Sequence, residues 1–147
     1  MRFGRMDRPE NDEGGGVWAV SKVSITVISG SREKLQFAAM MASVAAVSAY
    51  EVTVFLSMNA LPHFLVSAPR SAPAEGEIGR LIEEKNVPEF VGLFEQAAEL
   101  GDAKIHPCSM AVDILAIGKD DLLPFLAEPM GLTKFLTAAE GGQCWSF

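Results

Sequence analysis

Residues 103–118, AKIHPCSMAVDILAIG, decide how the chain folds and where its chemistry lies. The first part is typical of a short buried strand over 104–107, and the part after Cys108 is typical of an apolar helix that stops at Gly118. Cys108 therefore stands at the N-terminus of a helix. Free backbone N–H groups and the positive end of the helix dipole stabilise an anion at such a position. Because the thiolate is the nucleophilic form of cysteine, Cys108 is the candidate nucleophile.

Strands and helices alternate on both sides of this stretch. Segments rich in Val and Ile predict strands over 20–29 and 50–57, and the end of the chain predicts a short strand over 143–147. Residues 122–125 favour either a short strand or a helical turn. Helices are predicted over 32–49, 77–84, 89–100 and 132–139. This order indicates an α/β fold with a mainly parallel sheet of about five strands and right-handed crossovers.

The predicted strands end close to several polar or small residues. Ligands bind beyond the carboxyl ends of the strands in such sheets, and Cys108 lies at that edge. The irregular segment 58–88 starts at the same edge. The predicted rim of a pocket therefore consists of Gly30, Ser31, Met58, Asn59 and His63. The run Gly30-Ser31-Arg32 could also hold an anion at a helix start, but it lacks a full phosphate-loop pattern, which favours a plain turn.

Four residues near Cys108 are candidates for supporting roles. The backbone N–H groups of Ser109 and Met110 are expected to stabilise the thiolate. His106 lies on the same face as Cys108 if the strand continues, so it could act as a cation or a base, although a histidine bonded to backbone is slightly favoured. Asp113 could orient a partner group, or equally bond a neighbouring loop or subunit.

The composition limits the classes of protein to which the chain can belong. The chain has 147 residues and a net charge of −7, which argues against a nucleic-acid binder because no basic stripe is present. Two cysteines, Cys108 and Cys144, are too few for a disulfide scaffold, and a reducing cytoplasm is the simplest expectation. No secretory signal is expected in residues 1–19, which favour a disordered tail before a single domain over 20–147.

Several further patterns favour ordinary packing over a membrane span, a metal site or a second reactive cysteine. Residues 35–58 are long enough for a membrane span, but Glu51 and several polar side chains favour a helix followed by a strand. The helix over 32–49 is apolar nearly all round, so one side is expected to cover the sheet and the other side to face a second subunit. The two histidines and Cys108 lack metal-ligand spacing, so no metal is expected. Cys144 is expected to be packed in the final strand.

Three features form a pattern that is known from a protein family. They are the strand VSITVISG over 23–30, the helix rich in Ala and Met, and above all the run CSMAVD over 108–113 followed by Ile117-Gly118. With these features, residues 23–147 resemble the DsrE/DsrF-like family of predicted peroxiredoxin-like or sulfurtransferase proteins. The resemblance implies a three-layer α/β/α, flavodoxin-like fold. It also implies homo-oligomers, trimers and hexamers among them.

The resemblance implies that Cys108 carries sulfane sulfur as a persulfide, with no cofactor, and exchanges it with TusA-like or rhodanese-like carriers. Cys144 matches no site of the family. Two other functions stay open. A thiol peroxidase would need an arginine near the thiolate, for which Arg32 and Arg70 are the candidates. A non-catalytic interaction subunit would use the apolar helix and the long loop to dock a partner.

Overall fold

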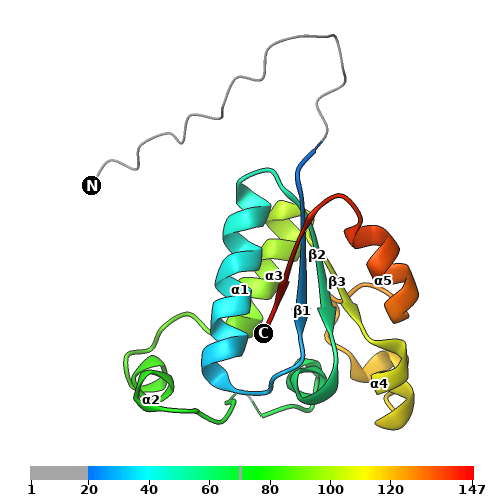
Figure 1. The fold of residues 1–147 in the computed structure, drawn as a ribbon. Helices are drawn as coiled ribbons and strands as arrows, with labels where there is room; N and C mark the ends of the chain where they lie inside the picture. Colours follow the sequence, from blue (N-terminus) through cyan, green and yellow to red (C-terminus); the bar gives the residue numbers. More distant parts are fainter. Residues whose placement is uncertain (1–19, 70) are drawn as a thin grey trace, which may run out of the picture.

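The computed structural model describes residues 20–69 and 71–147 (Figure 1). The predicted tail over 1–19 and the candidate Arg70 lie outside the described residues. The elements, in chain order, are β1 (Lys22–Val27), α1 (Arg32–Val47), β2 (Glu51–Leu56), the 3-10 helix η1 (Met58–Phe64), α2 (Glu77–Glu84), α3 (Phe90–Gly101), β3 (Lys104–Pro107), α4 (Ser109–Ile114), the 3-10 turn η2 (Lys119–Asp121), α5 (Leu132–Ala139) and β4 (Gln143–Ser146).

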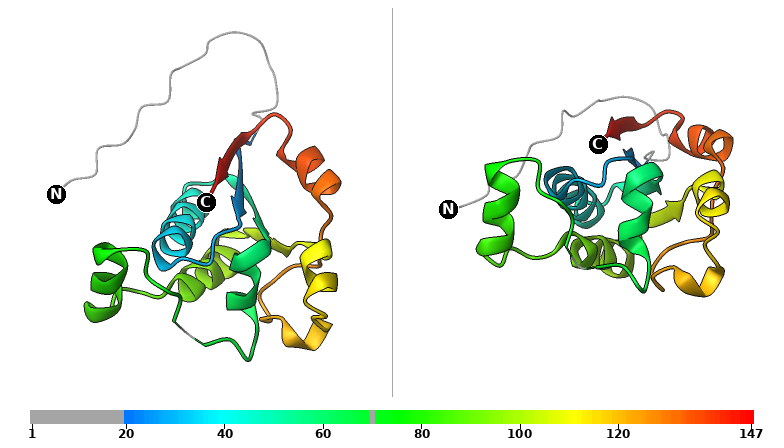
Figure 2. Two further views of the ribbon diagram at one scale, coloured as in Figure 1. Left: turned by 60° about the horizontal axis from the view of Figure 1, so that its bottom comes forward. Right: turned by 90° about the horizontal axis from the view of Figure 1, so that it is seen from below.

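The sheet is parallel throughout, with the strand order β3-β2-β1-β4. Helices α1 and α3 cover one face, and α4 and α5 lie on the other (Figures 1 and 2). The predicted three-layer α/β/α fold is therefore confirmed. Strands β1, β2 and β3 end level with one another, because Val27 pairs with Leu56 and Leu56 pairs with Pro107.

The sheet has four strands among the described residues, so the prediction of about five is wrong. In the segment expected to add a strand, Leu122 makes only an isolated antiparallel bridge to Leu65. A second segment, 127–130, does run along the outer edge of β3. The Ala127 N–H donates to the Ile105 carbonyl at 2.8 Å, and the Met130 N–H donates to the Pro107 carbonyl at 2.9 Å. Pro129 has no N–H, so this edge is bonded without becoming a regular strand.

The core fills both sides of the sheet. Ile25, Val54 and Ile105 lie side by side in register and are fully buried on the face covered by α1 and α3. On the other face, the rings of Phe55 and Phe135 stack with centroids 5.0 Å apart. Strands that are buried on both faces require continuous apolar runs, which is why the β-branched segments of this sequence became its central strands.

The apolar stretch 35–58 forms a helix and a strand, as expected from its sequence. α1 ends at Val47, and Ala49 has a positive φ of 63° at the turn into β2. Within the described part of the chain, none of the helices has the length and apolar character needed to cross a membrane.

Candidate functional site

Cys108 lies at the carboxyl end of β3, where the sequence places it. It is the N-cap of α4 and has an extended backbone, with φ −67° and ψ 122°. Its N–H donates to the Leu56 carbonyl at 2.8 Å, so the residue continues the line of β3 along β2. The residue is only 5% exposed. The candidate nucleophile therefore lies at the carboxyl edge of the sheet but is buried.

The loop before α5 passes directly beside Cys108. Cys108 and Met130 form an isolated parallel bridge, and the Ser109 N–H donates to the Met130 carbonyl at 3.0 Å. The expectation that the Ser109 amide stabilises the thiolate is therefore wrong, because this donor already has an acceptor. Of the two expected donors, the Met110 amide is the one left for an anion. α4 is also shorter than expected, since it ends at Ile114.

His106 lies two residues before Cys108 on an extended backbone, so both side chains leave the same face of the sheet. The His106 Nδ1 lies 2.7 Å from the Glu128 carbonyl oxygen. A carbonyl can only accept, so Nδ1 carries the hydrogen and Nε2 keeps a lone pair in the neutral ring. The backbone-bonded histidine that the sequence slightly favoured is present. Asp113 is exposed on α4, where the described residues give its carboxylate no hydrogen bond.

Three residues of the predicted pocket rim pack against one another in a cluster of their own. A Cβ placed on Gly30 would lie 2.6 Å from the Asn59 carbonyl oxygen and 3.1 Å from Nε2 of His63, so these three residues pack tightly together. Burial lowers the pKa of His63, and a hydrogen bond with the Gly30 backbone partly opposes that effect. Gly30 follows β1, which lies two strand spacings, roughly 10 Å, from β3, the strand that Cys108 follows.

The other two rim residues have different surroundings. The Ser31 N–H donates to Oγ of Ser29 at 3.2 Å, and Ser31 is buried. Met58 is exposed and has a positive φ of 49°. The Arg32 N–H donates to the Pro73 carbonyl at 2.9 Å. The plain turn is therefore the better interpretation of Gly30-Ser31-Arg32.

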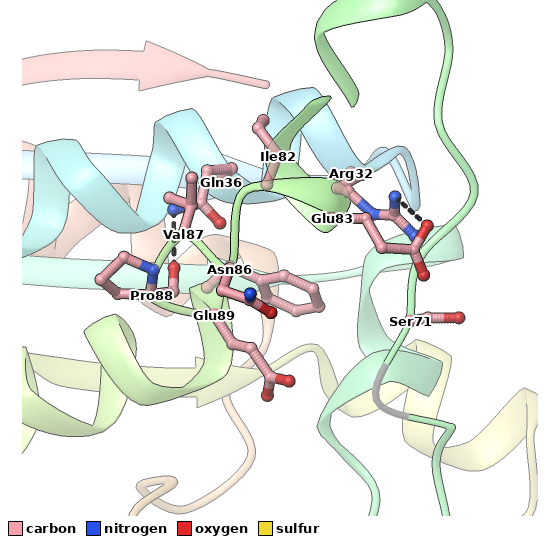
Figure 3. A pocket seen from close by; sticks show the side chains of 10 residues that line it. Arg32, Gln36, Ser71, Ile82, Glu83, Asn86, Val87, Pro88 and Glu89 are labelled. Carbon is pink, nitrogen blue, oxygen red and sulfur yellow. Dashed lines mark hydrogen bonds and ion pairs between the residues drawn. The ribbon is translucent and has the colours of Figure 1, made fainter. Parts of the chain in front are cut away.

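A cavity of about 620 Å³ opens instead between the start of α1, α2 and the start of α3 (Figure 3). The Arg32 side chain is 10% exposed, and its Nη1 donates to the Gly79 carbonyl at 2.9 Å and to Oε2 of Glu83 at 2.8 Å. Gln36 donates from Nε2 to the Pro88 carbonyl at 2.9 Å. Arg32 thus anchors α2, and this weakens its case as the arginine of a peroxidase.

Glu33 holds the other end of α2. Its carboxylate accepts the backbone N–H groups of Glu75, Gly76 and Gly79 at 2.8–3.1 Å. These hydrogen bonds, led by that from Glu75, lower the pKa of Glu33 to about 2. No local sequence signal marks this cluster, because its partners lie more than 40 residues away along the chain.

Cys144 is exposed on β4, so the expectation that it is packed is wrong. β4 is an edge strand, and an edge strand of four residues is only partly covered. Cys108 and Cys144 are both free and lie at opposite edges of the sheet, separated by three strand spacings, or about 14 Å in the direction across the strands alone. A disulfide needs Cα atoms within roughly 7 Å, so the two thiols of one chain cannot pair without rearrangement.

Comparison with known proteins supports the fold and the family. The model of the DsrE/DsrF/DrsH-like family matches residues 74–145, a segment that includes Cys108. A search of curated proteins finds no match. The structure of MTH1491 from Methanobacterium thermoautotrophicum, a protein of unknown function, is similar with a TM-score of 0.63 and 10% identity, over 86% of this chain and 99% of that one. The ychN protein from E. coli is similar with a TM-score of 0.60 and 16% identity, over 87% and 100%. At these identities the likeness shows the fold.

Proposed function

Because residues 74–145 place this chain in the DsrE/DsrF/DrsH-like family, we propose that it holds sulfane sulfur as a persulfide on Cys108 and passes it to an acceptor thiol. The observation that carries the proposal is the position of Cys108. It lies inside the matched segment, at the carboxyl edge of a parallel sheet, where it opens α4. Family and fold support a role related to sulfur relay in general, and the persulfide is the finer step that we propose. The cytoplasm is the proposed compartment.

The chemistry is thiol exchange in two balanced steps. The Cys108 thiolate attacks the outer sulfur of a persulfide donor R–S–SH, the S–S bond of the donor breaks, and R–S⁻ leaves with the bonding electrons. An acceptor thiolate then attacks the outer sulfur of the Cys108 persulfide and regenerates the Cys108 thiolate. No net oxidation or reduction occurs. The lone pair on Nε2 of His106 makes this residue a candidate to take up the thiol proton.

The burial of Cys108 fits a carrier whose sulfur must not be lost. A persulfide beside Met130 and Ala111, both buried, is shielded from free thiols in solution. Transfer then requires local opening, and α4 is suited to it because it is a helix of six residues with an exposed outer side. Small donors are therefore expected to load Cys108 more readily than bulky ones.

Exposed apolar side chains lie on the two helices nearest to Cys108. They are Met110 and Ile114 on α4, and Leu132 and Leu136 on α5. The N-termini of α4 and α5 adjoin, since the Ser109 hydroxyl lies 3.7 Å from a Cβ placed on Gly131. We propose this α4/α5 surface as the place where a TusA-like or rhodanese-like carrier docks.

The second candidate function is a non-catalytic interaction subunit. The low exposure of Cys108 together with large exposed apolar surfaces favours it. A thiol peroxidase is less well supported, because Arg32 is anchored to Glu83 and Cys144 lies at the far edge of the sheet. In the interaction subunit, Cys108→Ser would keep all function.

The test is the intact mass after incubation with thiosulfate, polysulfide or glutathione persulfide. Wild type is compared with Cys108→Ala and with the matched control Cys144→Ala. We expect a gain of one sulfur, about 32 Da, that dithiothreitol removes and that only Cys108→Ala lacks. An adduct found only on Cys144, or none with any donor, would contradict the carrier and favour the interaction subunit.

A further inference from the structure

The cavity between α1, α2 and α3 has no part in the sulfur chemistry proposed for Cys108. It lies at the starts of α1 and α3, which cover one face of the sheet, whereas Cys108 opens α4 on the other face (Figure 1). Its volume of about 620 Å³ is in the range of small-molecule sites. Two polar side chains of α1, those of Arg32 and Gln36, form part of its wall although both residues are buried (Figure 3). Polar groups of this kind orient a ligand in a pocket.

Arg32 has one edge of its guanidinium group that is not bonded to the described residues. Nη1 uses its two hydrogens for the Gly79 carbonyl and for Oε2 of Glu83, and none of the described residues accepts a hydrogen bond from Nε or Nη2. Every fully buried side-chain nitrogen or oxygen of the described residues has a partner, so solvent reaches Nε and Nη2 through the cavity that Arg32 lines. The hydrogens of Nε and Nη2 lie side by side, which is the arrangement that binds both oxygens of a carboxylate.

Gln36 adds a hydrogen-bond acceptor one helical turn from Arg32. Its Nε2 donates to the Pro88 carbonyl at 2.9 Å, so Oε1 is the end of the amide that is left for a ligand. None of the described residues donates to Oε1, which solvent therefore also reaches through the cavity. Side chains four residues apart on a helix are neighbours. A carboxylate on Arg32 and an N–H donor on Gln36 therefore suit one small molecule in which the two groups are close together, as they are on a single α-carbon.

The charges around the cavity favour a ligand that has a positive group as well as a negative one. Arg32 and Glu83 form an ion pair at 2.8 Å, so their charges largely cancel. Glu89 also lines the cavity and has no ion-pair partner among the described residues. An anion alone would lie near the carboxylates of Glu83 and Glu89, which would repel it. An ammonium group near Glu89 offsets this repulsion.

We propose that the cavity binds a free α-amino acid with a large apolar side chain. The α-carboxylate accepts hydrogen bonds from Nε and Nη2 of Arg32, and the α-ammonium group donates to Oε1 of Gln36 and to the Glu89 carboxylate. Each charged group of the zwitterion thus meets a group of opposite charge. The apolar side chain of the ligand packs against the apolar part of the wall, which includes Ile82, Val87 and Phe90.

The test measures the binding of matched compounds to the full chain by isothermal titration calorimetry. Phenylalanine has the carboxylate, the ammonium group and an apolar body, whereas phenylpropanoate lacks the ammonium group and phenylethylamine lacks the carboxylate. We expect phenylalanine to bind with a Kd of about 1 mM or lower, and each of the two truncated compounds to bind about tenfold more weakly or worse. Leucine and methionine are measured beside phenylalanine, so that the result does not depend on one side chain.

Two substitutions, each with a matched control, locate the site. Arg32→Lys keeps a positive charge near Glu83 but has no pair of parallel donors, so it should weaken phenylalanine binding about tenfold. Its control is Arg80→Lys in α2, because the Arg80 side chain is 66% exposed and is not among the described lining residues. Glu89→Gln should also weaken binding, and its control is the exposed Glu95→Gln on the same helix. Both controls should bind as wild type does.

The folding of α2 is checked in the same variants, because Arg32 also anchors this helix. Hydrogen exchange of amides 77–84 without ligand shows whether Arg32→Lys keeps α2. Glu89→Gln changes none of the bonds that Arg32 makes to α2, so it tests the site even if Arg32→Lys loses the helix.

Absence of binding by all three amino acids at concentrations up to about 10 mM would overturn the proposal. It would also be overturned if phenylethylamine or phenylpropanoate bound as tightly as phenylalanine, since one charged group would then be enough. Equal affinities of Glu89→Gln and Glu95→Gln would overturn the assignment of the ammonium group. The inference does not rest on sulfur chemistry, so Cys108→Ala should bind phenylalanine as wild type does.

Discussion

Gly30 is the residue at which a single added methyl group should report on the carboxyl edge of the sheet. In Gly30→Ala, the new Cβ would lie 2.6 Å from the Asn59 carbonyl oxygen, whereas ordinary contact begins at about 3.5 Å. The gap must therefore widen by roughly 0.9 Å. η1 cannot retreat easily, because two of its own residues, Ala60 and Leu61, are fully buried. Overpacking of this kind costs about 1–3 kcal/mol of unfolding free energy.

This loss is large enough to measure. A change of 1 kcal/mol shifts Tm by about 2–4 °C in a chain of this size, so we expect Tm to fall by roughly 2–12 °C. The same movement carries His63 toward solvent. Because burial lowers the pKa of His63 in the wild type, its pKa should rise toward the ordinary value of 6.5, as followed by NMR titration.

Gly92→Ala is the control for this experiment. A Cβ at Gly92 has no atom within 4 Å, and the residue lies inside α3, so alanine should stabilise the fold by about 0.5–1 kcal/mol. The two substitutions are chemically identical and should shift Tm in opposite directions. If Gly30→Ala were as stable as wild type, with an unchanged His63 pKa, the close packing of Gly30 against η1 would be refuted.

Two further predictions concern Glu33 and the two thiols. The pKa of Glu33 lies near 2 in the folded chain against an ordinary 4.5, so its anchoring of α2 should be complete above about pH 4.5 and be lost as the pH falls toward 2. Hydrogen exchange should show this loss as reduced protection of amides 75–84. Glu33→Gln should show the reduced protection already at pH 6, whereas the exposed Glu84→Gln should be protected as wild type is. Equal protection in all three proteins would contradict the anchor. A thiol reagent such as dithionitrobenzoate should label exposed Cys144 in a fast phase and buried Cys108 in a slow one. If local opening around Cys108 costs a free energy of even about 1.4 kcal/mol, the labelling of Cys108 is about tenfold slower. Cys144→Ala should lack the fast phase, and a single fast phase for both thiols would show that Cys108 is not protected.

Elements whose signals are local could be predicted from the sequence to the residue. β3 over 104–107, α2 over 77–84 and α5 over 132–139 have the predicted bounds. Each contains its own periodicity and its own boundary residues, such as Gly131 before α5. The junction at Cys108 belongs to this class, because a strand that ends in proline and passes into a helix is defined by adjacent residues.

Features that depend on distant partners could not be predicted in this way. The ion pair of Arg32 with Glu83 joins residues 51 positions apart, and nothing in either segment indicates the other. The bond from Ser109 to Met130 decides which amide remains for a thiolate, yet it depends on how the loop before α5 passes the end of β3. The exposure of Cys144 likewise follows from the strand order, which leaves β4 at the edge of the sheet that the described residues form.

The proposed docking surface predicts the effect of one further substitution. Cys108 and the α4/α5 surface lie together at the end of β3, and Leu136 on α5 is exposed. Leu136→Lys should therefore slow the transfer of sulfur to a carrier protein. An unchanged rate of transfer would show that the carrier docks elsewhere.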